Sequence, residues 1–368
     1  MKFQRIVIKL GTSTLTAGTN RLSPPHLVEL VRQISSLQAA SREMLLVSSG
    51  AIAVGRERLN YPQLPKDIPA KQMLAAVGQP HLMAFYEQLF SLYGIIVAQV
   101  LLTRADLSNR RRYLNSRNTL AALLSQRAIP VINENDTVAT EEIRVGDNDN
   151  LSAFVASLIE ADLLILLTDQ PGLFTADPRR HPEARLVKEV GEAEIPKDLW
   201  QAAGGTSNGL GTGGMVTKLQ AANLARRSGT TVVIANGQDP NVLVRLADGE
   251  ALGTRFHPLA TVVEGRKRYL LTGRGAAGKL GVDDGAVQAL RRGGSLLPVG
   301  LAQVEGQFER GDSISVVDRA GREIARGLTN YSSADLERIR GSRSDGIEDI
   351  LGYVYGDEVI HRDNMVLL

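Results

Sequence analysis

Residues 163–168 read Leu163-Leu-Ile-Leu-Leu-Thr168, an apolar run that ends in a threonine and is followed by Asp169. A run that is apolar at nearly every position is typical of a strand buried on both faces of a parallel sheet. Further short segments of apolar and β-branched residues are Arg5–Leu10, Met44–Ser48, Ile95–Leu101, Ile129–Ile132 and Thr230–Asn236. Together these segments predict the strands of one sheet.

Helix-like stretches separate the predicted strands along the first 260 residues. They are Pro25–Ala40, Lys71–Tyr93, Tyr113–Gln126, Asn150–Glu160 and Met215–Arg227. Repeated alternation of strand and helix implies right-handed crossovers, which place helices on both faces of the sheet. The sequence therefore predicts an α/β fold, a three-layer αβα sandwich around a mostly parallel sheet.

The character of the chain changes after about residue 270. Short apolar or alternating segments, such as Ser295–Val299 and Ser313–Val317, are separated there by turns rich in glycine or aspartate, a pattern typical of a small β-rich domain. We expect a first domain over residues 1–260, a linker over 261–275, and a β-barrel-like second domain with the C-terminal tail over 276–368.

Composition narrows the functional class. The 368 residues are 43% hydrophobic and 22% charged, which is ordinary for a globular protein of two or three domains. A formal net charge of +2 does not by itself indicate a nucleic-acid partner. The absence of cysteine excludes disulfides, thiolate metal sites and a cysteine nucleophile. Apolar runs are too short for a signal peptide or a membrane span, so we expect a cytoplasmic protein without membrane contact.

The strongest local motif is Gly209-Leu-Gly-Thr-Gly-Gly-Met-Val-Thr-Lys218, which leads into the last predicted helix. A glycine-rich loop that opens a helix can bind phosphate through its backbone N–H groups and the helix dipole. Lys218 then lies in the first turn, where its charge can meet a phosphoryl group. The loop also fits G-x-G-x-x-G through Gly209, Gly211 and Gly214, but the strand before it and the later acidic residue of a dinucleotide site are missing.

Two further groups of charged residues lie where a parallel sheet binds ligands, beyond the carboxyl ends of its strands. Lys9 interrupts an apolar strand, which costs free energy unless its ammonium group reaches an anion or water. Asp147, Asn148 and Asp149 precede the helix predicted from Asn150. Two aspartates around an asparagine exceed what a helix cap needs. They could orient lysines, hold Mg²⁺ through water, or fix a substrate amine.

Other strand ends carry polar residues with less specific meaning. Ser48-Ser49-Gly50 offers hydroxyl and backbone donors for a carboxylate, although such a junction is common. Thr168-Asp169 precedes a turn-rich loop that suits an adenine and a ribose, although the turn residues alone would explain it.

Six motifs, in this order and at these intervals, resemble those of the glutamate 5-kinases, a family within the amino-acid kinase superfamily. They are Lys9-Leu-Gly-Thr-Ser13, Val47-Ser-Ser-Gly-Ala51, Asn133-Glu-Asn-Asp136, Gly146-Asp-Asn-Asp149, Leu166-Leu-Thr-Asp169 and Gly211-Thr-Gly-Gly-Met-Val-Thr-Lys218. Residues from about Ala276 to Tyr353 resemble the PUA domain that follows the kinase domain in bacterial members. The resemblance covers essentially the whole chain.

This resemblance implies ATP-dependent phosphorylation of the side-chain carboxylate of L-glutamate to L-glutamyl 5-phosphate, the first step of proline biosynthesis. It implies that Lys9 and Lys218 contact the migrating phosphoryl group, that Asp149 holds both lysines, and that Asp147 supports this arrangement. The residues implied in glutamate binding are Ser49, Asp136 and Asn148. Those implied in ATP binding, with Mg²⁺ on the phosphates, are Lys9, Thr168, Asp169, Thr212, Gly213, Gly214, Met215, Val216, Thr217 and Lys218.

Partners follow from the same resemblance. Proline shares the α-amino-acid end of glutamate, so we expect it to inhibit at or near the glutamate pocket. A homo-oligomer and transfer of the labile product to glutamyl phosphate reductase are also implied. RNA binding by the PUA domain stays open, because residues 276–353 mix acidic and basic side chains and have few aromatics. The alternatives are a kinase for N-acetylglutamate or aspartate, an RNA-binding protein, and a catalytically silent amino-acid sensor.

Overall fold

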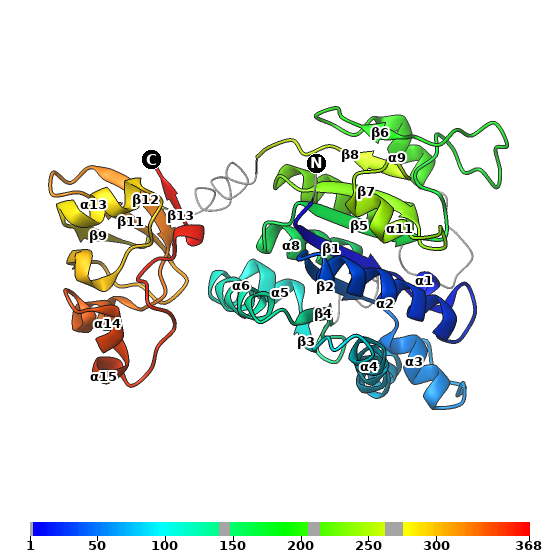
Figure 1. The fold of residues 1–368 in the computed structure, drawn as a ribbon, viewed down its shortest axis with the longest axis horizontal. Helices are drawn as coiled ribbons and strands as arrows, with labels where there is room; N and C mark the ends of the chain where they lie inside the picture. The colour runs from blue at the N-terminus through cyan, green and yellow to red at the C-terminus, as the bar shows by residue number, and fades with distance from the viewer. Residues whose placement is uncertain (1–2, 140–147, 205–213, 262–274) are drawn as a thin grey trace. The chain divides into compact units, whose positions relative to one another are not determined.

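The computed structural model describes residues 3–139, 148–204, 214–261 and 275–368, and the chain divides into two compact units (Figure 1). The first unit comprises Met1–Leu107 and Arg117–Val262, and the second comprises Ser108–Ser116 and Val263–Leu368. Each unit has a hydrophobic core of its own. Along the described residues no helix is both long enough and apolar enough to cross a membrane.

An eight-stranded sheet forms the middle layer of the first unit. Its strand order is β3-β4-β2-β1-β5-β7-β8-β6, and only the β7–β8 pair is antiparallel. The strands are β1 (Arg5–Leu10), β2 (Glu43–Ser48), β3 (Val97–Leu102), β4 (Ile129–Glu134), β5 (Leu163–Thr168), β6 (Glu189–Val190), β7 (Thr231–Asn236) and β8 (Thr254–Phe256). The mostly parallel sheet that was predicted from the apolar runs is confirmed.

Helices cover both faces of this sheet, which gives the predicted αβα sandwich (Figure 1). On one face, α8 (Asn148–Leu158) and α10 (Met215–Arg227) pack against each other. On the other face lie α2 (Pro24–Ala39), α4 (Ile68–Ser91) and α11 (Val242–Ala247). The remaining helices that the structure describes before residue 261 are α1 (Thr12–Thr16), α3 (Ala51–Arg58), α5 (Arg104–Ser108), α6 (Arg110–Ser125) and α9 (Lys197–Ala203).

The alternation of side chains along β1 determines where its lysine lies. Ile6, Ile8 and Leu10 belong to the core between the sheet and helices α2, α4 and α11. Successive side chains of a strand point to opposite faces, so Lys9 lies on the face that packs against α8. Because β1 is flanked by β2 and β5, Lys9 does not lie on an edge strand, from which its ammonium group could easily reach water.

The second unit contains a five-stranded sheet in the order β10-β9-β11-β12-β13. Its strands are β9 (Gly278–Val282), β10 (Leu301–Glu305), β11 (Ser313–Val317), β12 (Glu323–Leu328) and β13 (Met365–Leu367). Between residues 275 and 368 its helices are α13 (Asp284–Arg291), α14 (Ser333–Ile339) and α15 (Ile347–Leu351). The short helical turns are η1 (Pro298–Gly300), η2 (Ser344–Gly346) and η3 (Arg362–Asn364).

Of the two segments quoted for this β-rich unit, Ser313–Val317 is a strand and Ser295–Val299 is not. Leu296 makes a single bridge to Ile360, and η1 begins at Pro298. Proline has no backbone N–H to donate to a ladder, so strand pairing does not continue there.

Candidate active site

Asp149 lies at the centre of a buried cluster of charges. Lys9 Nζ is 2.6 Å from Asp149 Oδ1, and Lys218 Nζ is 3.2 Å from Oδ2. The Thr217 hydroxyl donates a hydrogen bond of 2.6 Å to the same Oδ2. Asp149 has no exposed surface, and the two lysines are only 5% and 6% exposed. One carboxylate therefore holds two ammonium groups close together and largely out of water.

Three separate elements deliver these side chains. Lys9 is the last residue but one of β1, Asp149 is in the first turn of α8, and Lys218 is in the first turn of α10. The helix dipole favours the carboxylate at the start of α8 and disfavours the lysine at the start of α10. Because α8 and α10 pack against each other, Asp149 provides the counter-charge that Lys218 needs.

The protonation of Asp149 reflects this environment. Burial by itself would raise the pKa of its carboxyl, but the charges of Lys218 and Lys9 and the hydrogen bonds from Lys9 and Thr217 outweigh that effect. The pKa of Asp149 is therefore held well below its usual range. The carboxylate stays ionised at any pH at which the protein would work.

A second cluster contains two of the residues predicted to bind glutamate. Asn148 Nδ2 donates to Ser49 Oγ at 2.9 Å and to Asn133 Oδ1 at 2.9 Å. The third predicted residue, Asp136, is half-buried two residues beyond β4, and burial raises the pKa of its carboxyl to about 6. Since Asn148 precedes Asp149 in the chain, the two clusters meet at the start of α8.

The predicted nucleotide residues lie at the ends of neighbouring elements. Thr168 Oγ1 donates to Asp169 Oδ1 at 3.1 Å at the end of β5, the strand that pairs with β1. Gly214 is the N-cap of α10, and its carbonyl oxygen is 2.8 Å from Thr217 Oγ1. Met215 and Val216, in the first turn of that helix, are half-buried.

Some predicted residues lie outside the described part of the chain. They are Asp147, Thr212 and Gly213. The helix predicted from Asn150 begins earlier, at Asn148, so Asn148 and Asp149 are helical residues and not a loop before the helix. Among the described residues, no group of three acidic or histidine side chains could hold a metal ion.

Two residues that complete the second cluster carried no predicted role. Asn133 stands in the Asn133–Asp136 motif, and its Nδ2 donates to Gln79 Oε1 at 2.8 Å. Gln79 lies in the middle of α4, between Gly78 and Pro80, two residues that are unusual inside a helix but do not indicate a partner for the glutamine. The strand-end position of Asn133 was therefore a usable signal, whereas Gln79 could only be found in the structure.

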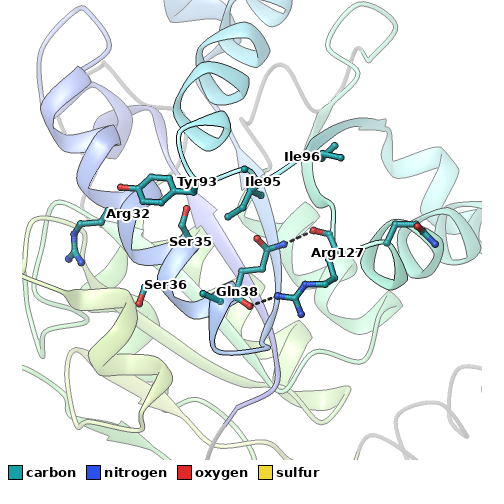
Figure 2. A pocket seen from close by; sticks show the side chains of 11 residues that line it. Arg32, Ser35, Ser36, Gln38, Tyr93, Ile95, Ile96 and Arg127 are labelled. Carbon is teal, nitrogen blue, oxygen red and sulfur yellow. Dashed lines mark hydrogen bonds between the residues drawn. The ribbon is translucent and has the colours of Figure 1, made fainter.

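A cavity of about 490 Å³ opens at the end of the sheet where its parallel strands begin (Figure 2). Its lining residues stand at the end of α2, before β3 and before β4, which places it at the amino ends of the strands. Gln38 and Arg127 bridge part of its wall, each side chain donating to the other's backbone carbonyl. The clusters around Asp149 and Asn148 lie at the carboxyl ends of the strands, so this cavity is not the candidate active site.

A parallel sheet that gathers two lysines on one buried carboxylate, at the carboxyl ends of its strands, is the framework of an enzyme that handles anionic phosphoryl groups. The family model for the amino acid kinase family matches residues 4–236, and the model for the PUA domain matches residues 278–351. The chain is thus a kinase with a C-terminal PUA domain.

Whole-length relatives narrow this class. The chain is 54% identical to glutamate 5-kinase of Shewanella sediminis, with 100% of this chain and 98% of the relative aligned. It is 57% identical to that of Sodalis glossinidius, with 99% of each aligned, and 55% identical to that of Deinococcus radiodurans, with 99% of this chain and 100% of the relative aligned. The chain belongs to the glutamate 5-kinase family.

Proposed function

We propose that this kinase transfers the γ-phosphoryl group of ATP to the side-chain carboxylate of L-glutamate, which yields ADP and L-glutamyl 5-phosphate in the first step of proline biosynthesis. The observation that carries the proposal is the pair Lys9 and Lys218, held together by Asp149. Phosphoryl transfer between two anions is mainly a problem of positioning and of neutralising charge. The full-length likeness to glutamate 5-kinases supports glutamate as the acceptor.

In the proposed mechanism both lysines contact the migrating phosphoryl group and act in the same way. Their ammonium groups neutralise the oxygens of the phosphoryl group as it leaves ADP and joins the acceptor. Asp149 touches neither reactant and positions both lysines, with Asp147 as its proposed support. The acceptor carboxylate is already ionised at neutral pH, so the reaction requires no general base.

The proposed glutamate subsite uses Asp136, Asn148 and Ser49. The Asp136 carboxylate provides the charge for the α-ammonium group, which would lower the raised pKa of that carboxyl. Ser49 Oγ accepts a hydrogen bond from Asn148, so its own proton remains for a substrate carboxylate.

The proposed nucleotide subsite comprises Thr168, Asp169 and residues 212–218, with Lys9 and Lys218 shared between nucleotide and acceptor. Both oxygens of Asp149 are close to lysines, so that carboxylate does not suit a metal ion. We assign Mg²⁺ to the ATP phosphates, where it would contribute further positive charge.

A hydroxamate-trapping assay tests the acceptor directly. The protein is incubated with ATP, Mg²⁺ and hydroxylamine, together with glutamate, N-acetylglutamate or aspartate. The proposal expects acyl phosphate with glutamate, at a kcat/KM at least about a hundredfold above the other two acids. A preference for N-acetylglutamate or aspartate would replace the proposed substrate, and no product with any acid would remove the function.

Inhibition by proline belongs to the same proposal, because proline presents the same α-ammonium and α-carboxylate groups as glutamate. Activity at subsaturating glutamate should fall with millimolar proline and recover when glutamate is raised. Unchanged activity would show that proline does not compete at this site.

The proposal also includes the domain limits 1–260, 261–275 and 276–368, a cytoplasmic location, a homo-oligomer and transfer of the labile product to glutamyl phosphate reductase. The separate cores of the two units support the division into domains. Light scattering of the purified protein, and product transfer in the presence of the reductase, test the two partner proposals.

A further inference from the structure

The three amides of Gln79, Asn133 and Asn148 form one chain of hydrogen bonds from α4, across the end of β4, to the start of α8. Asn133 Nδ2 donates to Gln79 Oε1 at 2.8 Å, and Asn148 Nδ2 donates to Asn133 Oδ1 at 2.9 Å. All three side chains are buried. The chain ends at Ser49, whose hydroxyl oxygen accepts from Asn148 Nδ2 at 2.9 Å.

A single backbone group sets the direction of every amide in this chain. The backbone N–H of Glu134 donates to Asn133 Oδ1 at 2.8 Å, and a backbone N–H can only donate. Asn133 must therefore direct its oxygen toward Glu134 and Asn148, and its Nδ2 toward Gln79. Gln79 in turn must offer an oxygen to Asn133, and Asn148 must offer its nitrogen.

This polarity leaves Asn148 with only an acceptor to offer. Its Nδ2 is used by Ser49 and Asn133, whereas its Oδ1 is buried and has no hydrogen-bond partner among the described residues. A buried acceptor without a partner costs free energy, unless a ligand supplies the missing donor. The oxygen therefore suits an N–H group and not a carboxylate.

Helix α4 holds Gln79 at a fixed height above the strands. Its neighbour Gly78 packs so closely on α3 that an added Cβ would lie 1.8 Å from the carbonyl oxygen of Ala51. Gln72 and Tyr86 lie seven residues before and after Gln79, on the same face of the helix. The Gln72 side chain donates to the backbone oxygen of Ala139, and Tyr86 OH lies 2.8 Å from Ser48 Oγ. These contacts support the turn that follows Asp136 and the strand end that carries Ser49.

We propose that Gln79 is a positioning residue. The Glu134 N–H sets the direction of the Asn133 amide, and Gln79 Oε1 anchors that amide from its other end, so that Asn133 holds Asn148 in place as an acceptor for the α-ammonium group of the substrate. The inference deepens the proposed function, since it assumes that the acceptor acid binds here. In this proposal Gln79 acts through Asn133. Its own Nε2 is buried and has no hydrogen-bond partner among the described residues, and a direct contact of that group with a substrate carboxylate would affect acids with and without an amino group alike. Through Asn133, Gln79 favours an acid with a free amino group over the same acid without one.

Equilibrium binding separates this role from general support of the pocket. Glutamate and glutarate, which lacks only the amino group, are titrated by calorimetry into the full-length protein and into Gln79→Leu. The Kd of glutamate should rise about tenfold in the variant, while the Kd of glutarate stays within about threefold. An equal change for both ligands, or no change for either, would overturn the inference.

Further variants make the test specific. Gln79→Glu keeps an acceptor oxygen toward Asn133, ionised or protonated, and should bind glutamate within about threefold of the parent. If Gln79→Glu weakened glutamate binding as much as Gln79→Leu does, the proposed positioning of Asn148 through Asn133 would be contradicted. Gln88→Leu, the same change at an exposed position of α4, serves as the matched control, and Gln79→Ala replaces the leucine variant if that protein does not fold.

Turnover is measured separately from binding. If the parent protein binds glutamate but makes no glutamyl phosphate, the proposed function is wrong, whereas the proposed role of Gln79 in binding is not contradicted. In the opposite case the parent turns over glutamate, but Gln79→Leu still prefers glutamate over glutarate as strongly as the parent does. That result would remove only the proposed role of Gln79.

Discussion

At the scale of single residues, the proposed contact between Asp136 and the substrate's ammonium group predicts that glutamate binding depends on pH. Burial raises the pKa of its carboxyl to about 6, so the group is mostly neutral below that pH and ionised above it. An ammonium group binds the ionised form. The KM for glutamate should therefore be flat above about pH 7 and rise roughly tenfold for each pH unit below 6. Initial rates from pH 5 to 8, with saturating ATP, measure this dependence.

The variant Asp136→Asn is the control for that profile. Its KM should be high and nearly independent of pH over the same range. The raised pKa also means that ionised Asp136 destabilises the empty folded state as pH rises from about 4 through 6. Asp136→Asn should therefore raise the melting temperature at pH 8 and leave it unchanged near pH 4. A parent-like KM profile in the variant would assign the titration to another group.

How far the sequence predicted the site depends on where each residue lies. Lys9, Asp149 and Lys218 stand in local motifs at strand ends or helix starts, and the family resemblance assigned their shared role. Spacing alone could not have placed three residues from β1, α8 and α10 on one carboxylate. The local sequence could not assign a role to Gln79, because its proposed role depends on a side chain 54 positions away in the sequence.

At the scale of elements, the crossing of α3 and α4 positions the proposed glutamate subsite. A Cβ added at Gly78 would lie 1.8 Å from Ala51 O and 2.5 Å from the backbone nitrogen of Gly55, and one added at Gly55 would lie 1.9 Å from Leu74 O. Backbone atoms cannot move aside as a flexible side chain can. The two helices therefore require glycine at both positions of contact.

We expect Gly78→Ala to separate these helices and to shift Gln79 with them. The substitution should lower the free energy of unfolding by about 1–3 kcal/mol, by overpacking, and also raise the KM for glutamate. Denaturant unfolding and initial rates measure the two effects. Gly346→Ala is a suitable control, because its φ is −89° and a new Cβ there meets no atom within 4 Å. A stable Gly78→Ala variant with parental KM would contradict the role of the crossing.

The elements themselves were largely predictable. Apolar runs predicted the six longest strands of the first sheet, and Leu163–Thr168 was found with its predicted bounds. The short strands β6 and β8 have two and three residues, too few to show a hydrophobic pattern. Ile95 and Ile96 extended one predicted strand too far. Ile95 packs against the core from the turn before β3 and Ile96 is exposed, and in sequence both look like strand residues.

At the scale of the whole molecule, each of the two units has a hydrophobic core of its own, and every described site residue belongs to the first unit. A chain that ends at residue 261 should therefore fold and keep its kcat and its KM for glutamate within about threefold. Calorimetric unfolding and initial rates of the shortened and full-length proteins test this expectation. A folded but inactive shortened protein would show that the second unit takes part in catalysis.

The central claim is that Lys9 and Lys218 neutralise the same phosphoryl group while Asp149 holds them together. The most direct test is the rate of glutamate-dependent ADP release by Lys9→Met and by Lys218→Met, with Lys197→Met, on an exposed turn of α9, as the control. We predict that each site variant loses about 10²–10³ in kcat with its fold intact, whereas the control keeps the parental rate. A parental kcat in either site variant would contradict the account.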